Sequence, residues 1–292
     1  MGTARLLPLM LLLVLLVSPV PAAAADVVRF APLPLEDPKI IYEQFRGLAD
    51  YLARATDTTL RWVAHDDYAD ILTGFRDGAL DLAYLGPLPY VVLERIDPSA
   101  EPLGCFRDAD GAADYTCSLV VFGGGIRPAD IRGMHIGLTQ PYSTCGYLAV
   151  SEMLHAAGRS LERDGNHFDY AGSHSEAALG VVRGRYDVAG VKTAIAHRYA
   201  HLNLERIAES RPYPGFTLVA NTATLPPEVL ARLRQAVLAL DRERNPRVPG
   251  ITAGWGAQIR HGTVPPERCD YSGIAATLER LPWPIPGAEP LQ

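Results

Sequence analysis

Lysine is almost missing from this chain of 292 residues. Lys39 and Lys192 are its two lysines, and the other members of its 27 basic residues are arginines. The 33 acidic residues outnumber them, which gives a formal net charge of −6. An excess of negative charge argues against nucleic acid or an anionic membrane surface as the partner, although it leaves room for a local positive pocket.

Long apolar runs are missing after residue 17. The run "LLPLMLLLVLLV" at residues 6–17 is shorter than the roughly 20 residues that a membrane span requires. Arg5 precedes this run and the small residues of "SPVPAAAAD" follow it, a pattern typical of a secretory signal peptide. We therefore expect residues 1–25 to be cleaved off and the protein to be exported to the periplasm.

Sequence motifs of known catalytic sites are missing as well. The chain has no G-x-S-x-G, H-E-x-x-H, Walker-type or C-x-x-C sequence, and its histidines lack the spacing of metal ligands. No metal and no cofactor are therefore expected. An enzyme stays open only as an alternative, in which Cys145 would be the nucleophile and His174 its base.

Strand-like and helix-like segments alternate along the chain. Residues 27–33, 60–65 and 80–86 are expected to be strands, with a helix after each of them. Asp37 and Pro38 supply the N-cap and the first residue of the helix after the first strand. This β-α-β-α-β order predicts a parallel, doubly wound α/β sheet.

A second α/β unit is expected to begin near Gly123. Its strands are predicted at residues 134–139, 168–172 and 186–191, and extended crossings near 120–126 and 212–220 would join it to the first unit. The prediction is an α/β clamshell with one lobe from residues 26–122 and 221–292 and another from residues 123–220. Ligands of open parallel sheets lie at the carboxyl ends of the strands, so the turns there would face each other across a cleft.

The turn "QPYSTCGYLAVSEML", residues 140–154, places Ser143 and Thr144 at the start of an amphipathic helix. Hydroxyl side chains at this position cap the free N–H groups of the first turn. The same N–H groups, at the positive end of the helix dipole, can hold an anion. The two uses are compatible, and we expect this turn to bind an oxyanion.

Four segments in order resemble one known family: "DLAYLGPLPYVV", "QPYSTCGYLAVSEML", "FDYAGSHSEAALGVVRGRYDVAGV" and "ESRPYPGFTLVANTATLPPEV". They are similar to the periplasmic phosphate-, phosphite- and phosphonate-binding proteins of the PhnD type, which serve ABC importers. The resemblance runs from about residue 27 to residue 281. It implies a monomeric, two-lobed periplasmic binding protein of type II that captures a small oxyanion and delivers it to an ABC transporter permease.

The resemblance also implies which residues touch the ligand. Ser143, Thr144 and Gly146 match the oxyanion turn, where Cys145 replaces the family's second serine. The remaining ligand contacts that we expect from this family pattern and from the predicted cleft turns are His174, Tyr90, Lys192 and Lys39.

Cys145 has two interpretations. It can fill the volume of a serine, because free cysteine behaves as a small apolar residue. Alternatively, a helix N-terminus lowers the pKa of a thiol, and the thiolate would suit a thiophilic oxyanion such as arsenite. That second interpretation fits a binding protein that serves a sensor kinase instead of an importer.

The four cysteines allow three complete disulfide pairings, which the sequence cannot separate. Cys105 and Cys117 stand symmetrically about Gly111, the middle of an expected hairpin turn. Opposed positions of paired strands are close enough for a bridge, so we predict a disulfide between these two cysteines. Cys269 then has no evident partner except Cys145.

Overall fold

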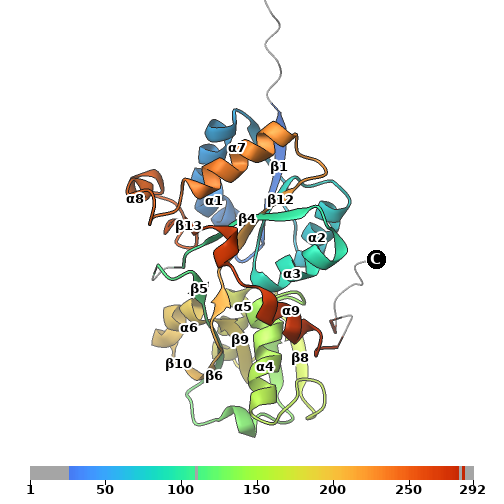
Figure 1. Ribbon diagram of the computed structural model, residues 1–292. Coiled ribbons are helices and arrows are strands. Elements are labelled where there is room, and N and C mark those ends of the chain that lie inside the picture. The colour runs from blue at the N-terminus through green and yellow to red at the C-terminus, as the bar shows by residue number, and fades with distance from the viewer. Residues whose placement is uncertain (1–25, 109–110, 283–284, 287–292) are drawn as a thin grey trace, which may run out of the picture.

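Two α/β units lie one above the other in the computed structural model, which describes residues 26–108, 111–282 and 285–286 (Figure 1). The predicted signal peptide, residues 1–25, falls outside this range. Within the described residues, no helix combines the length and the apolar character that a membrane crossing needs.

The upper unit is built on a six-stranded sheet with the strand order β13-β4-β12-β3-β1-β2. β1 pairs in parallel with β2 and β3, as the alternating sequence pattern predicts, while β12, β4 and β13 add antiparallel pairs. The strands are β1 (Val27–Pro32), β2 (Thr59–Trp62), β3 (Leu82–Leu85), β4 (Ala100–Phe106), β12 (Thr217–Asn221) and β13 (Thr263–Val264).

Successive residues of these strands point to opposite faces of the sheet, and both faces are buried. Phe30, Leu82 and Tyr84 pack on one face, in an apolar cluster with residues of α1 and α7. The residues next to them in the strands, such as Ala31 and Ala83, pack on the other face, in a cluster with residues of α2 and α3. The helices are α1 (Pro38–Thr56), α2 (Tyr68–Arg76), α3 (Pro87–Ile96) and α7 (Pro227–Leu238).

Helix α1 begins where the sequence predicts. The Asp37 carboxylate accepts a hydrogen bond from the amide nitrogen of Lys39 at 2.9 Å, and Pro38 is the first helical residue. Ile41, Phe45, Leu48 and the following apolar residues recur every three or four positions and form the buried face.

The lower unit is built on a five-stranded sheet with the order β10-β6-β9-β7-β8. β7 pairs in parallel with β8 and β9, and β6 pairs antiparallel with β9 and β10. Its strands are β6 (Cys117–Phe122), β7 (His135–Leu138), β8 (His167–Tyr170), β9 (Val188–Lys192) and β10 (Leu204–Glu209). Its helices are α4 (Ala149–Ala156), α5 (His174–Val182) and α6 (Thr193–Tyr199).

The chain crosses between the units in a two-stranded ribbon. β5 (Asp114–Tyr115) pairs antiparallel with β11 (Tyr213–Pro214), and Figure 1 shows β5 between the two units. The predicted lobe boundaries are therefore wrong by one strand on each crossing. β6, expected in the first lobe, joins the second sheet, and β12, expected mostly in the second lobe, joins the first, because each pairs beyond the ribbon.

The end of the chain runs along the junction. After α8 (Val248–Ile251), α9 (Ser272–Leu278) packs against α3 of the upper unit, and the Thr277 hydroxyl donates to the Glu152 carboxylate of α4. Short helical turns occur at η1 (Pro128–Asp130), η3 (Ala200–Leu202) and η4 (Pro266–Arg268).

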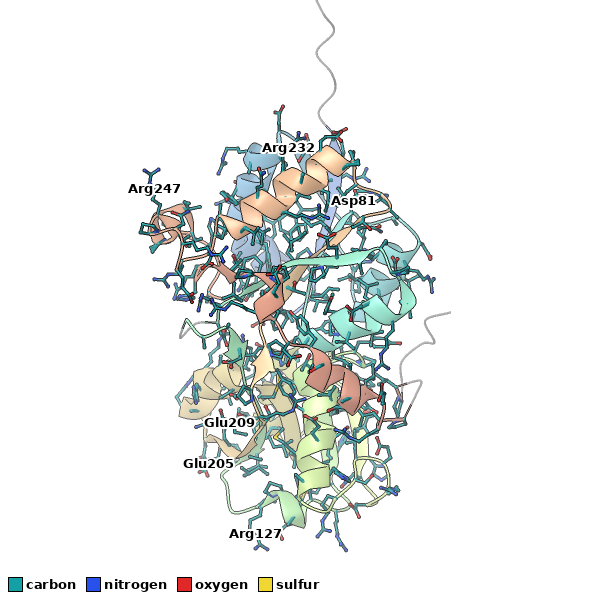
Figure 2. The ribbon with its side chains drawn as sticks, viewed as in Figure 1. Asp81, Arg127, Glu205, Glu209, Arg232 and Arg247 are labelled. Carbon is teal, nitrogen blue, oxygen red and sulfur yellow. A yellow bond between two sulfur atoms is a disulfide. The ribbon has the colours of Figure 1, made fainter. Side chains whose placement is uncertain are left out.

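One ion pair, between the partly exposed Arg29 and the buried Asp81, serves the fold and lies away from the junction. The Asp81 carboxylate accepts from the amide nitrogen and from Nε of Arg29, at 2.7 and 2.8 Å. Figure 2 shows Asp81 in the upper unit, above the junction. The pair ties the start of β3 to β1 and takes no part in the site described next.

Candidate functional site

A small cavity lies between the two units, at the carboxyl ends of their parallel strands. Its volume is about 10 Å³, counted as the space open to the centre of a water molecule, which is room for about one water. The turns at the carboxyl ends of six strands, β1, β2, β3, β7, β8 and β9, all contribute to it, as the predicted clamshell requires. The lining residues are Leu33, Tyr68, Gly86, Pro89, Tyr115, Ser143, Thr144, Cys145, His174, Lys192 and Phe216.

The turn at the start of the α4 segment is the densest source of hydrogen-bond donors. The Ser143 hydroxyl accepts from the amide nitrogen of Gly146 at 3.0 Å, and the chain then makes one wide helical turn, η2 (Thr144–Leu148). Among the described residues, the amide groups of Thr144 and Cys145 have no acceptor. Two N–H groups therefore remain available at the positive end of this helical segment.

Gly146 lets this turn approach the sheet. A Cβ atom at this position would lie 2.5 Å from the amide nitrogen of Thr139, at the end of β7. Gly146 does not line the cavity, and its N–H is used by the Ser143 cap. The prediction that its backbone N–H binds the ligand is therefore not supported, and a packing role explains this glycine.

The upper unit meets the turn through the first residues of α3. Leu88 donates its amide hydrogen to Oγ1 of Thr144 at 3.0 Å. Pro87 and Pro89 on either side have no N–H. The Thr144 oxygen is thus an acceptor for the upper unit, and the hydroxyl also makes a hydrogen bond with the Tyr115 phenol. The two contacts together fix the position of Thr144.

His174 is a buried, neutral donor. Its Nδ1 accepts a hydrogen bond from the amide nitrogen of Lys192 at 3.2 Å, so the neutral ring carries its hydrogen on Nε2. Burial, assisted by the nearby Lys192 charge, lowers the pKa of His174 to about 3. His174 therefore stays neutral in the site, because the desolvation of the imidazolium is too costly.

Lys192 brings a positive charge to the cavity wall, but the charge is already paired. Its Nζ lies 2.8 Å from a carboxylate oxygen of Asp108, and 4.9 and 5.6 Å from the ring centres of Tyr115 and Phe216. Ammonium groups over aromatic faces are attracted by the ring electrons. The carboxylate and the rings together fix the position of this side chain.

Tyr68 and Tyr115 are site residues that the sequence analysis did not assign. Burial raises the pKa of both phenols well above the ordinary value, so both stay protonated and can donate. A hydrogen bond with Thr144 lowers the pKa of Tyr115, but the effect of burial is larger. The signal for Tyr68 was its place at the start of a helix after a predicted cleft turn, whereas Tyr115 lies in the crossing ribbon.

Two residues expected at the ligand lie elsewhere. Tyr90 packs against Tyr271, with tilted rings whose centres are 4.7 Å apart, and donates to the Glu94 carboxylate at 3.0 Å. Pro89 faces the cavity, and Tyr90, one residue further along α3, is rotated by about 100° away from it. Lys39 is exposed on α1 in a groove beside Trp255.

The disulfide prediction is wrong as well. Cys105 pairs with Cys269, and Cys117 pairs with Cys145, with Cα atoms 6.3 and 5.1 Å apart. Cys105 and Cys117 cannot face each other, because β4 and β6 belong to different sheets instead of forming a hairpin.

The second disulfide removes the basis of two hypotheses. Cys145 has no thiol that could become a thiolate, so it cannot bind arsenite or act as a nucleophile beside His174. The Nδ1 atom of His174 is moreover occupied by the Lys192 amide.

Several hydrogen bonds join the two units across the cavity. The Tyr68 amide donates to the Gln140 side chain at 2.9 Å, beside the contact of Leu88 with Thr144. At the rim, Glu36 of the upper unit accepts from the Ser175 hydroxyl and from Arg198 of the lower unit, both at 2.9 Å. These bonds hold the units together around the cavity.

Comparison with known proteins agrees with this architecture. The family model described as "ABC transporter, phosphonate, periplasmic substrate-binding protein" matches residues 30–271. The phosphate-import protein PhnD of Mycolicibacterium smegmatis is 25% identical over 274 alignment positions, and the alignment covers 85% of this chain and 84% of that protein.

Solved structures of similar proteins share the fold. PhnD1 from Prochlorococcus marinus in complex with methylphosphonate has a TM-score of 0.74 at 19% identity, covering 87% of this chain and 98% of its own. A binding protein component of an ABC phosphonate transporter from Pseudomonas aeruginosa has a TM-score of 0.73 at 20% identity, covering 87% and 86%. The fold is that of the type II periplasmic binding proteins, and the chain belongs to the family of periplasmic substrate-binding proteins of phosphonate ABC transporters.

Proposed function

We propose that the protein binds a single small phosphorus oxyanion, namely a short phosphonate, phosphite or phosphate, in the cavity between its two units. The observation that carries this proposal is the convergence of donors on one enclosed point. The amide groups of Thr144 and Cys145, the phenols of Tyr68 and Tyr115, and the Nε2 hydrogen of His174 all belong to residues that line it.

The chemistry of these donors fits an oxyanion. An anion that leaves water loses much free energy unless its oxygens find hydrogen-bond donors. His174 donates without adding charge, and Lys192 supplies a positive charge that Asp108 partly offsets. Such a site balances a small anion mainly with dipoles and hydrogen bonds.

The size of the cavity limits the ligand. Space for about one water molecule is less than even a compact tetrahedral ion fills, so the lining residues would move outward slightly on binding, and a nucleotide or a long substituent would require far larger shifts. The apolar side chains of Leu33, Pro89 and Phe216 form part of its wall and would accommodate a hydrogen or methyl substituent on phosphorus. Two relatives, a phosphate-import protein and a protein in complex with methylphosphonate, support the same ligand class.

We further propose that the protein acts as a monomer that delivers its ligand to an ABC transporter permease, without catalysis. The two units would open at the ribbon of β5 and β11 to admit the ion and close over it, and the permease would bind the closed form. Cleavage of the predicted signal peptide would release the protein into the periplasm.

Titration calorimetry tests the ligand assignment. The protein is purified in its oxidised form and freed of ligand by unfolding and refolding. It is then titrated with methylphosphonate, phosphite, phosphate, 2-aminoethylphosphonate, sulfate and arsenite. We expect binding of at least one of the three compact phosphorus ions, weaker binding of 2-aminoethylphosphonate because of its longer substituent, and no binding of arsenite. Failure of all the phosphorus compounds to bind would contradict the proposal.

A further inference from the structure

The Cys117–Cys145 disulfide joins two different structural parts of the site, the crossing ribbon and the oxyanion turn. Cys117 is the first residue of β6, two positions after Tyr115 of the crossing ribbon. Cys145 lies in the oxyanion turn and lines the cavity. The bond therefore connects the crossing directly to the turn that offers the free amide groups.

The Cys117 end of this bond is held firmly by the backbone. Its amide donates to the Ser210 hydroxyl at 3.0 Å, and its carbonyl accepts from the Ser210 amide at 2.8 Å. On the other side it lies opposite Lys192 in the β6–β9 register. Cys117 thus has a fixed position relative to Lys192, whose amide in turn orients His174.

The Cys145 end belongs to a turn whose own hydrogen bonds are local. The hydroxyl and carbonyl of Ser143 accept from the amides of Gly146, Tyr147 and Leu148, while the Thr144–Leu88 bond depends on the upper unit. The turn also packs closely on β9, since a Cβ at Gly190 would lie 2.8 Å from the Cys145 carbonyl oxygen. When the units separate, the Leu88 bond is lost and the disulfide remains as the covalent link between this turn and β6.

We propose that the Cys117–Cys145 disulfide is a positioning element of the ligand site, which keeps the Thr144 and Cys145 amides aligned with Lys192 and Tyr115 before the ligand arrives. This inference rests on the proposed function. Preorganisation of donors increases affinity because the ordering cost is met during folding. By reciprocity, a bond that favours ligand binding must itself be protected by the ligand.

The Cys105–Cys269 disulfide is a matched control in the same chain. It joins β4 to the C-terminal region, and neither cysteine lines the cavity. Its loss should lower stability without disturbing the donors. A purely stabilising role of both disulfides would make the two losses equivalent for binding.

The test compares C117S/C145S with C105S/C269S and the wild type at a temperature where all three are folded, with methylphosphonate, phosphite and phosphate as ligands. We expect a lower melting temperature in both variants, and an affinity reduced about tenfold in C117S/C145S alone. Unchanged affinity in C117S/C145S would overturn the inference. Failure of the wild type to bind any of these ions would instead overturn the proposed function.

A second measurement does not depend on the variants folding. Wild-type protein is treated with dithiothreitol, which is oxidised to its cyclic disulfide while each protein disulfide takes up two electrons and two protons. The new thiols are alkylated with iodoacetamide and quantified by peptide. At a saturating concentration of the bound ion, we expect the equilibrium constant for reduction of Cys117–Cys145, measured in mixtures of reduced and oxidised dithiothreitol, to fall at least fivefold more than that of Cys105–Cys269. Equal changes in both would overturn the inference.

Discussion

The ammonium of Lys192 lies 2.8 Å from the carboxylate of Asp108, so the lysine that lines the cavity enters the site with its charge already balanced. Both side chains are largely shielded, with 16% and 19% of their surfaces exposed. The pair lets the empty site exist without an uncompensated buried cation, and it sets the net charge that an incoming anion meets.

Substitutions in this pair should change affinity in opposite directions. Asp108→Asn leaves Lys192 without its partner, and a bound anion then relieves the unpaired charge, so we expect tighter binding by about threefold or more. Lys192→Gln leaves Asp108 facing the anion and should weaken binding at least tenfold. Calorimetric titration of both variants checks this, with Lys39→Gln as the control that should match the wild type. Weaker binding in Asp108→Asn would contradict the account of this pair.

Acid should destabilise the protein through His174. The pKa of this side chain is lowered to about 3 by burial, so between pH 6.5 and pH 3 the unfolded chain takes up a proton that the folded chain does not. Stability that is present above pH 6.5 is therefore lost as the pH falls, by about 2 kcal/mol at pH 5. Urea unfolding at pH 7 and pH 5 measures the loss.

The His174→Asn variant isolates this effect, because asparagine keeps an acceptor for the Lys192 amide without a titrating ring. The difference in unfolding free energy between pH 7 and pH 5 should shrink by about 2 kcal/mol in this variant. The exposed His167, replaced by Asn, should keep the wild-type difference. A wild-type pH dependence in His174→Asn would show that His174 is not the group responsible.

Thr144 should be intolerant of losing its hydroxyl. Thr144→Val removes a donor from the site and leaves the Leu88 amide without its acceptor, which costs about 1–3 kcal/mol and lowers affinity about 10- to 100-fold. Thr144→Ser keeps the oxygen and should stay within about threefold of the wild type. Weaker binding in Thr144→Ser with wild-type affinity in Thr144→Val, measured by calorimetry, would assign the role to the methyl group instead.

Glu36 should strengthen ligand binding without touching the ligand. It receives hydrogen bonds from Ser175 and Arg198 across the cleft and does not line the cavity. Glu36→Ala disfavours the closed form by about 1 kcal/mol, which corresponds to about fivefold weaker binding, with faster release. Stopped-flow release of the ligand checks this. The control is Glu176→Ala, because the ion pair of Glu176 with Arg183 stays within the lower unit.

An unchanged release rate in Glu36→Ala would mean that the rim contact does not hold the closed form. Equal acceleration in Glu176→Ala would mean that the effect is not specific to a contact between the units.

Local signals made most of the fold predictable. The Asp37 and Ser173 caps and the apolar periodicity of α1 lie within a few residues of the elements that they define. The parallel strands place six turns at one edge, and this rule of topology brought Ser143, Thr144, Cys145, His174 and Lys192 to one cavity.

The wrong predictions concern features that depend on contacts with other parts of the fold. Cys105 and Cys117 are neighbours in sequence, but β12 and β9 draw their strands into different sheets, and this separation fixes the disulfide pairing. Tyr90 lies one residue beyond Pro89 on α3, and the rotation of the helix at this step turns its side chain away from the cavity. The charge of His174 depends on burial, which its own neighbours in sequence do not reveal.

A crystal structure of the oxidised protein with methylphosphonate tests the central claim most directly. The account predicts one tetrahedral ion between the units, within hydrogen-bond distance of the Thr144 and Cys145 amide nitrogens and of Nε2 of His174, with the Cys117–Cys145 bond intact. An ion bound elsewhere, for example beside Tyr90 and Glu94, or density for the ion in contact with neither the turn nor His174, would contradict it.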